Sequence, residues 1–272
     1  MGDQREERRM TIPRVSVIIP AWNDSASLSP TLDYLFSLAG VSEVEVIVAA
    51  CGGEDDVKRA VTGRARLLWS GRSTRAALMN AGAAAARGEI LFFLHADSFP
   101  PANAIELIQH SLSENAVVGG AFEHLFADPG WSLRTITWIN RVRYRLTRNY
   151  YGDQGMFVRA SLFYQMGGYK DMALLEDLDF SQRLKGMGRT VLIHLPLLTS
   201  GRRFLARGPW RTFFFITWLL LLHTLRLDTQ RYAERWRGPD DSSPGSPWPR
   251  GHLREATRPP IESRDSGVTV SD

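Results

Sequence analysis

The sequence contains a single cysteine, Cys51, and no apolar run of the roughly 20 residues that a membrane-spanning helix needs. One thiol excludes an internal disulfide framework and is typical of a reducing compartment, so we expect a cytoplasmic location. Residues 1–14 are rich in charge and the apolar run at 15–19 is short, which predicts no secretory signal.

The charge of the chain is moderately basic, with a formal net charge of +4, and nearly all of the positive charge is arginine. A basic chain favours an anionic partner. The sequence has no zinc-finger spacing, no base-reading helix pattern and no aromatic RNA-binding signature, which argues against nucleic acid. A phosphorylated substrate or a membrane surface fits the charge better.

Composition divides the 272 residues into four segments. Residues 1–13 and 238–272 are polar and contain few core-forming residues, which predicts a disordered leader and a disordered tail. Residues 14–200 are long enough to bury a full core and are expected to form one large domain. Residues 201–237 are both basic and apolar and are expected to form a C-terminal helical segment.

Short apolar runs alternate with helical patterns through most of the chain. Buried strands are predicted at 15–20, 44–49, 65–69, 90–94, 117–122 and 156–158. Helices are predicted at 28–36, 54–61, 76–87, 128–148 and 174–186, and a further helix follows Pro100-Pro101 and runs through Leu112. This order predicts an α/β fold, with a mostly parallel central sheet flanked by helices and a ligand site at the carboxyl ends of the strands.

Four polar motifs follow these strands or begin helices. They are Pro20-Ala21-Trp22-Asn23-Asp24, His95-Ala96-Asp97, Gly152-Asp153-Gln154 and Glu176-Asp177. Arg72 and Arg75 lie between the first two and could neutralise phosphate. Each motif also has a purely structural explanation, as a turn cap, a solvated charge pair or a set of acids at a helix start.

Taken in order across about residues 15–195, these motifs resemble the inverting family 2 glycosyltransferases of the GT-A fold. The helix sequence Met79-Asn80-Ala81-Gly82 matches as well. Tyr151-Gly152-Asp153-Gln154-Gly155 is similar to a bacterial branch associated with selenodomain or arsenosugar-type gene neighbourhoods. Any one motif is weak evidence, whereas the ordered set is specific.

The resemblance implies a metal-dependent transfer of sugar from a nucleoside-diphosphate donor. Asp97 corresponds to the last acid of the family's Asp-x-Asp motif and is implied to hold Mg²⁺ or Mn²⁺, which would stabilise the diphosphate as it leaves. His95 stands where the first Asp of that motif usually lies. Because Mg²⁺ prefers oxygen ligands, His95 is expected to contact the donor or orient the site, and a half-buried histidine bonded to backbone explains it equally well.

The resemblance also assigns the remaining site residues. Asp177 is implied to be the base that deprotonates the acceptor hydroxyl, with Glu176 bracing the turn, although geometry alone does not choose between them. Asp153 and Gln154, in a loop flanked by glycines, are expected to contact the acceptor or the donor sugar. The donor is expected to lie against Pro20, Trp22, Asn23, Asp24, Arg72, Arg75, His95 and Asp97.

One departure from the family pattern concerns the strand at 44–49, which in the family usually ends in an aspartate that reads the nucleobase. Here the following residues contain no acid until Glu54 and Asp55. Either a shifted acid reads the base, or the chain is a non-catalytic nucleotide- or membrane-binding descendant of the same fold. Both remain open from the sequence.

The apolar segment at 212–225 is flanked on both sides by arginines and lies among three tryptophans. It predicts either an interfacial helix on an anionic membrane or a helix packed on the core. An interfacial helix would suit a lipid-like acceptor and a peripheral position on the inner face of the cell membrane.

Overall fold

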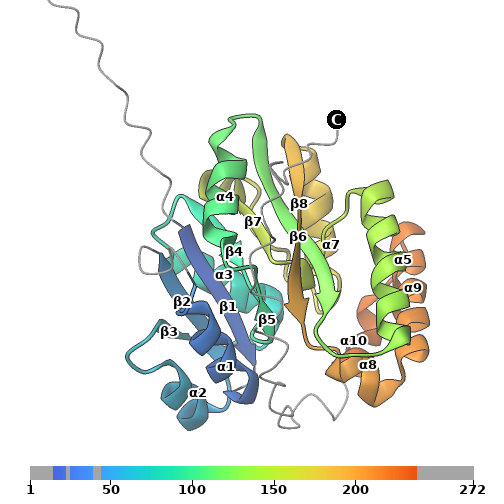
Figure 1. Ribbon diagram of the computed structural model, residues 1–272, viewed down its shortest axis with the longest axis horizontal. Helices are drawn as coiled ribbons and strands as arrows, with labels where there is room; N and C mark the ends of the chain where they lie inside the picture. Colours follow the sequence, from blue (N-terminus) through green and yellow to red (C-terminus); the bar gives the residue numbers. More distant parts are fainter. Residues whose placement is uncertain (1–14, 23–24, 39–43, 238–272) are drawn as a thin grey trace, which may run out of the picture.

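The strands of the computed structural model, which describes residues 15–22, 25–38 and 44–237, form one central sheet (Figure 1). They are β1 Val15–Trp22, β2 Glu45–Cys51, β3 Arg66–Trp69, β4 Ile90–Phe93, β5 Ser98–Phe99, β6 Val117–Phe126, β7 Met156–Arg159 and β8 Arg189–Thr199. Their order across the sheet is β3-β2-β1-β4-β7-β6-β8-β5.

Most neighbouring strands in this sheet are parallel. β1 pairs in parallel with β2 and β4, β2 with β3, and β6 with β8, whereas β7 runs antiparallel between β4 and β6. The predicted α/β fold with a mostly parallel sheet is therefore confirmed.

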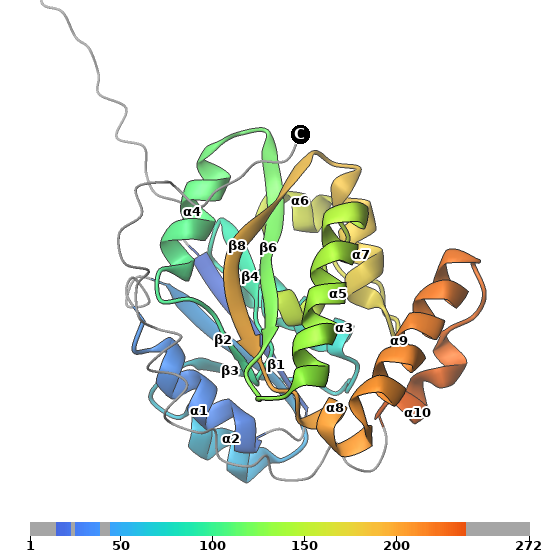
Figure 2. The same ribbon diagram turned by 45° about the vertical axis from the view of Figure 1, so that its right-hand side comes forward.

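Helices cover both faces of the sheet (Figures 1 and 2). They are α1 Ser25–Leu35, α2 Glu54–Val61, α3 Arg75–Ala85, α4 Ala104–Ser113, α5 Trp131–Thr147, α6 Ala160–Gln165, α7 Glu176–Lys185, α8 Arg202–Arg207, α9 Pro209–Thr224 and α10 Ala233–Arg237, with short 3₁₀ turns η2 Gly152–Gln154 and η3 Gln230–Tyr232. Apolar residues of α1, α2 and α4 pack into one core cluster, and those of α3, α6 and α7 into a second.

The central strand β1 supplies both clusters because its side chains alternate between the two faces. Val17 and Ile19 join the first cluster, and Ile18 joins the second. Gly82 of α3 lies so close to β1 that an added Cβ would come within 2.5 Å of Ile18 Cγ2. Two residues earlier in α3, Asn80 Nδ2 donates to the Tyr169 carbonyl at 2.8 Å, and Asn80 Oδ1 accepts from the Tyr169 N–H at 2.9 Å. The Met79–Gly82 motif therefore fixes α3 against β1 and against the loop that precedes α7.

The elements that were not predicted include β8, the short strand β5 and α6. Pro196 lies inside β8, and an internal proline argues against a central strand because it lacks the N–H that the ladder requires. The structure accommodates Pro196 at a register shift: β6 residues Phe122 and Glu123 pair with Ile193 and Pro196, so two residues of β8 bulge out.

The C-terminal helices pack against the domain and also expose apolar side chains. Leu219 and Leu222 of α9 are buried, whereas Phe214 and Trp218 are 63% and 48% exposed. One side of α9 therefore packs on the domain, and an interfacial role for its exposed side stays a prediction. Among the described residues, no helix combines the length and the apolar character needed to cross a membrane. The predicted disordered leader and tail lie outside the described residues.

Candidate active site

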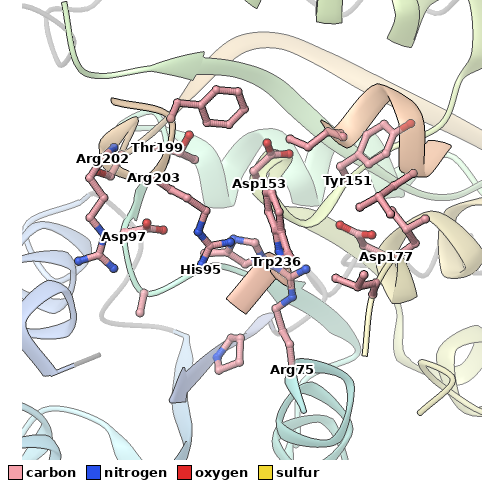
Figure 3. A pocket seen from close by; sticks show the side chains of 18 of the residues that line it. Arg75, His95, Asp97, Tyr151, Asp153, Asp177, Thr199, Arg202, Arg203 and Trp236 are labelled. Atoms are coloured by element: carbon pink, nitrogen blue, oxygen red, sulfur yellow. Dashed lines mark hydrogen bonds between the residues drawn. The ribbon is translucent and has the colours of Figure 1, made fainter. Parts of the chain in front are cut away.

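A cavity of about 350 Å³ opens where β1 and β4 end (Figure 3). Pro20 and Trp22 come from β1, Arg75 begins α3, and His95 and Asp97 follow β4. Because β1 and β4 are parallel, their carboxyl ends meet at one edge of the sheet. The ligand site expected at that edge coincides with the cavity.

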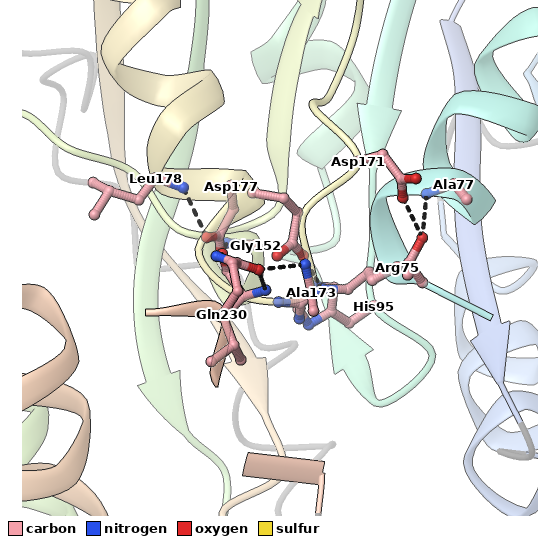
Figure 4. Close-up of polar contacts among 12 residues, drawn as sticks. Arg75, Ala77, His95, Gly152, Asp171, Ala173, Asp177, Leu178 and Gln230 are labelled. Carbon is pink, nitrogen blue, oxygen red and sulfur yellow. Dashed lines mark hydrogen bonds and ion pairs between the residues drawn. The ribbon is translucent and has the colours of Figure 1, made fainter. Parts of the chain in front are cut away.

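Arg75 links two of the predicted motifs from the start of α3 (Figure 4). Its Nε donates to Oε1 of Glu176 at 2.5 Å, and its Nη1 lies 3.2 Å from Nε2 of His95. A guanidinium has no acceptor, so Nε2 of His95 accepts in this contact and the ring proton is on Nδ1. Burial, Arg75 and Arg203 hold the pKa of His95 well below its usual value. His95 is therefore neutral, with its Nε2 lone pair directed at Arg75.

Asp177 lies at the start of α7 and lines the cavity, although it is only 7% exposed. Its Oδ2 accepts from the Gly152 N–H and its Oδ1 from the Leu178 N–H, both at 2.7 Å. Burial and the neighbouring Glu176 carboxylate raise the pKa of Asp177 to about 6, against the opposing effects of Arg75 and the two N–H groups. A carboxylate with this pKa is basic enough to accept a proton near neutral pH.

The backbone before α7 decides which acid faces the cavity. Leu175 has φ +62°, a left-handed conformation that is uncommon for a residue with a side chain. Gln230 of η3 holds the preceding residues, accepting from the N–H groups of Ala173 and Leu174 at 2.7 and 3.1 Å and donating to the Leu174 carbonyl at 3.0 Å. This arrangement buries Glu176 against Arg75 and leaves Asp177 at the cavity.

Gly152 makes close contact with two of the site residues. A Cβ added there would lie 2.6 Å from His95 Nε2 and 3.3 Å from Asp177 Oδ2. The glycine thus allows the η2 backbone to approach both side chains and to donate its N–H to Asp177.

Asp97, which follows β4 and lines the cavity, is the acid positioned to bind a metal ion at that end. Within the described residues, no three His, Cys, Asp or Glu side chains lie close enough together to hold a metal ion. Mg²⁺ and Mn²⁺ in nucleotide sites are often held by one or two carboxylates, with phosphates and water completing the shell. Asp97 fits that arrangement as a single protein ligand, and His95, directed at Arg75, does not complete a protein-only site.

Some predicted residues lie elsewhere. Arg72 pairs with Asp171 and does not line the cavity. Gln154 is fully buried: its Oε1 accepts from the Tyr151 N–H and its Nε2 donates to the Phe122 carbonyl, both at 3.0 Å. The expected substrate contacts of Arg72 and Gln154 therefore do not match their positions, because other residues already hold both side chains. Asn23 and Asp24 lie outside the described residues.

A polar pocket wall beside Asp153 was not predicted. His124 of β6 lies 3.6 Å from Asp153 Oδ2 and 2.7 Å from the Thr199 hydroxyl. Burial lowers the pKa of His124, so the ring is neutral. Asp153 Oδ1, His124 Nδ1 and Asn140 Oδ1 are buried, and none of the described residues forms a hydrogen bond with them. Buried polar atoms in this state mark a place where a ligand's hydroxyl groups could bond.

The C-terminal segment supplies further cavity residues that the sequence did not single out. Arg202, Arg203 and Trp236 all line the cavity. In the sequence the two arginines were counted only as charge flanking an apolar run, because the strand before them, β8, was not predicted.

Comparisons with known proteins agree with this architecture. A sequence model of the family described as glycosyl transferase family 2 matches residues 16–167, more than half of the chain. No curated protein matches the sequence significantly. A mannosyltransferase, PcManGT from Pyrobaculum calidifontis, solved with GDP-Man and Mn²⁺, is similar in structure with a TM-score of 0.54 at 19% identity, over 70% of this chain and 58% of that one. The present chain thus spans well under two thirds of that protein.

A second solved structure covers more of the fold. Glucosyl-3-phosphoglycerate synthase from Mycobacterium tuberculosis, in complex with Mn²⁺, UDP and glucosyl-3-phosphoglycerate, is similar with a TM-score of 0.56 at 16% identity, over 79% of this chain and 81% of that one. At these identities the likeness shows the fold, which is the GT-A fold of glycosyltransferases. With the family match over most of the sheet, the chain belongs to glycosyl transferase family 2 and is a glycosyltransferase.

Proposed function

We propose that the protein transfers a sugar with inversion from a nucleoside-diphosphate donor to a hydroxyl or carboxyl group. The observation that carries this proposal is Asp177, a buried carboxylate that lines the cavity and has a pKa of about 6. In one displacement step the acceptor oxygen bonds to the anomeric carbon as the bond to the diphosphate breaks. Asp177 takes the proton of a hydroxyl acceptor, whereas a carboxylate acceptor carries no proton to remove, and in both cases the nucleoside diphosphate leaves as an anion.

The donor occupies the end of the cavity formed by β1 and the turn after β4. Pro20 and Trp22 lie against the nucleoside. Asn23 and Asp24, which follow Trp22 in the sequence, stay predicted donor contacts. Asp97 holds Mg²⁺ or Mn²⁺ together with the donor phosphates, and when bound this cation stabilises the growing charge of the leaving diphosphate. The Mn²⁺ and nucleotide ligands of both solved relatives support this assignment.

Arg75 is the group that connects the donor end with the base. It pairs with Glu176, and the negative charge of Glu176 in turn raises the pKa of Asp177. Glu176 therefore acts as a positioning and tuning residue, whereas Asp177 meets the substrate. Arg72 and Gln154 take structural roles, the first through Asp171 and the second through the η2 loop.

The acceptor lies beside Asp153, against the polar wall of His124 and Asn140. We propose that it also has an apolar part, because a second cavity between α5 and α9 is bounded by Arg143, Tyr151 and Phe213, which also line the first cavity.

The outer faces of the same two helices expose large apolar side chains. Trp131, Trp138 and Leu146 of α5 are 72%, 65% and 81% exposed, and the helix α9, which contacts α5, exposes Phe214 and Trp218. Such a surface supports a lipid-like acceptor and peripheral binding at the inner face of an anionic membrane. Residues 201–237 then belong to the catalytic unit, and membership of the selenodomain or arsenosugar-associated branch stays a prediction.

The end of β2 favours a second candidate, a non-catalytic nucleotide- or membrane-binding protein. Glu54 and Asp55, the nearest acids to the missing nucleobase reader, are exposed on α2 and do not line the cavity. A descendant that no longer binds a nucleotide-sugar donor would have no need of a nucleobase-reading acid after β2.

A nucleotide-by-metal screen separates the two candidates. We expect UDP, GDP or another nucleoside diphosphate to raise the melting temperature, and Mn²⁺ to increase that shift. Incubation with the corresponding nucleotide sugars should then release the nucleoside diphosphate, and NMR of the product should show inverted anomeric configuration. Absence of any nucleotide-linked stabilisation would refute the enzyme and favour the binding protein.

A further inference from the structure

Two adjacent arginines extend from α8 into the catalytic cavity. Arg202 and Arg203 follow β8 directly, and Figure 3 shows both side chains on the side of the cavity where Asp97 and His95 lie. Asp177 and Tyr151 lie on the opposite side (Figure 3). The pair is therefore at the proposed donor end.

The backbone that carries these arginines is tightly held. The Gly201 N–H donates to Asp128 Oδ2 at 2.5 Å, and the Arg202 N–H donates to the Ser200 hydroxyl at 3.2 Å. A Cβ at Gly201 would lie 2.9 Å from Leu133 Cδ1, so the turn between β8 and α8 packs directly on α5. The two side chains thus start from a fixed position.

The Arg203 side chain is also oriented at its far end. Its guanidinium lies over the Trp236 ring, 4.7 Å from the ring centroid. Trp236 is in turn fixed by Arg207, whose Nη1 donates to the Trp236 carbonyl at 2.6 Å. Stacking on an aromatic face fixes the plane of the guanidinium, and an arginine held in this way can bind a planar or tetrahedral anion along its edge.

The balance of charge at this end of the cavity favours an anion. Among the described residues that line this end of the cavity, Asp97 is the single carboxylate, and Arg75, Arg202 and Arg203 line the same cavity. Arg75 is already engaged with Glu176 and His95. A metal held by one carboxylate would leave much of a diphosphate's charge to these arginines.

We infer that Arg202 and Arg203 bind the donor's diphosphate directly, alongside any metal on Asp97. This inference rests on the proposed donor class. Guanidinium–phosphate bonds are charge-assisted and often bidentate, and they do not need the metal to form. The protein should therefore bind nucleoside diphosphates more tightly than nucleoside monophosphates even when divalent cations are removed.

The test is calorimetry of UDP, GDP, UMP and GMP binding to the full chain in excess EDTA. We expect the wild type to prefer at least one diphosphate over its monophosphate, and R202Q and R203Q to lose about tenfold or more of the diphosphate affinity. Monophosphate affinity should change much less. R211Q is the matched control, since Arg211 is exposed on α9, carries the same charge and does not line the cavity.

Each outcome bears on a different claim. If R202Q and R203Q bind diphosphates as R211Q does, the arginine pair is not the diphosphate site, while the proposed donor class stands. If the wild type binds diphosphates only with Mn²⁺, the metal-independent role of the arginines is refuted. If it binds none under either condition, both proposals fall. Should a glutamine variant unfold, R202M and R203M keep the aliphatic stem without the charge, and an undiminished preference for diphosphate in both would also overturn the inference.

Discussion

The two walls of the catalytic cavity are built in different ways. The wall formed by residues 15–99 consists of the ends of parallel strands, where Pro20 and Asp97 lie directly after buried apolar runs. The wall formed by residues 126–237 consists of helices and short turns, where Asp177, Arg203 and Trp236 come from three separate elements. In the first wall, strand geometry alone places the polar groups. In the second, their positions depend on contacts between segments distant in sequence.

This difference extends to the proposed chemistry. The strand-end wall receives the donor, which needs a few groups in a fixed place at the edge of the sheet. The helical wall supplies the base, tunes its pKa through Glu176 and covers the donor with α8. Substitutions in the helical wall should therefore separate turnover from donor binding.

The largest effect is expected for D177N. An amide keeps the size of the side chain but cannot accept the acceptor's proton, so kcat should fall by about 10³-fold while the affinity for the donor changes little. Steady-state kinetics and calorimetry with the nucleotide sugar measure the two quantities. D179N is the control on the same helix, because Asp179 bonds Lys170 and Arg183 instead of lining the cavity. Undiminished turnover by D177N would assign the base elsewhere.

Gly152→Ala should have the next largest effect. The new methyl group would lie 2.6 Å from His95 Nε2, so either the η2 backbone or His95 must move. We expect about a tenfold to hundredfold lower kcat, and a free energy of unfolding lower by about 1–3 kcal/mol. Gly71→Ala provides a matched control, since nothing lies within 4 Å of its added Cβ. Equal behaviour of the two variants would mean that the η2 loop is free to shift.

The two walls also differ in how far the sequence could predict them. In the strand-end wall, Pro20, Trp22, His95 and Asp97 lie where the sequence places the ends of their strands, because an apolar run followed by a polar motif fixes both the strand and the place of its end. Their contacts with a donor stay predictions. The pattern does not place Arg72, which pairs with Asp171 outside the cavity, and Asn23 and Asp24 lie outside the described residues.

In the helical wall, the sequence analysis named Asp153 and the Glu176-Asp177 pair but could not give the contacts that position them. Spacing could not choose between Glu176 and Asp177, since the choice depends on the positive φ of Leu175 and on Gln230, 53 or more residues away. Nor could it find Arg203, whose placement depends on β8, a strand hidden by Pro196, and on stacking with Trp236. Such contacts leave no local periodicity in the sequence.

The pH dependence of the helical wall gives a smaller, graded effect. With a pKa raised from 3.8 to about 6, Asp177 is deprotonated above about pH 6, so kcat should fall about tenfold per pH unit below that value. A pH–rate profile in buffers of constant ionic strength measures it. A profile flat down to pH 4.5 would contradict the raised pKa.

The same shift predicts a stability effect of opposite direction. Between about pH 4 and 6 the folded state binds more protons at Asp177 than the unfolded state, so this group's contribution to stability declines as pH rises through that window. D177N removes the cost of the buried charge. It should therefore be more stable than the wild type above pH 6, by about 1–3 kcal/mol, and the difference should vanish near pH 4. Urea titrations at pH 4, 6 and 8 test this.

The smallest effect is expected at Gln230, which touches no substrate. Q230A removes three hydrogen bonds to the backbone of Ala173 and Leu174, so Leu175 would be free to relax from its positive φ. We expect a loss of about 1–2 kcal/mol in the free energy of unfolding and a fall of a few-fold in kcat, with donor affinity unchanged. Q165A, at an exposed position of α6 outside both cavities, controls for loss of a glutamine side chain.

The kinetic pattern of Q230A decides whether the helical wall positions the base or only supports the fold. If Gln230 merely adds stability, kcat at a temperature where the variant is fully folded should equal that of the wild type. If it sets the direction of Asp177, kcat should stay low at that temperature, and the pKa in the pH–rate profile should move down from about 6 toward 3.8 as Asp177 turns out of its buried position. A shift of that kind would show that a contact from the C-terminal segment controls the protonation of a carboxylate 53 residues earlier in the chain.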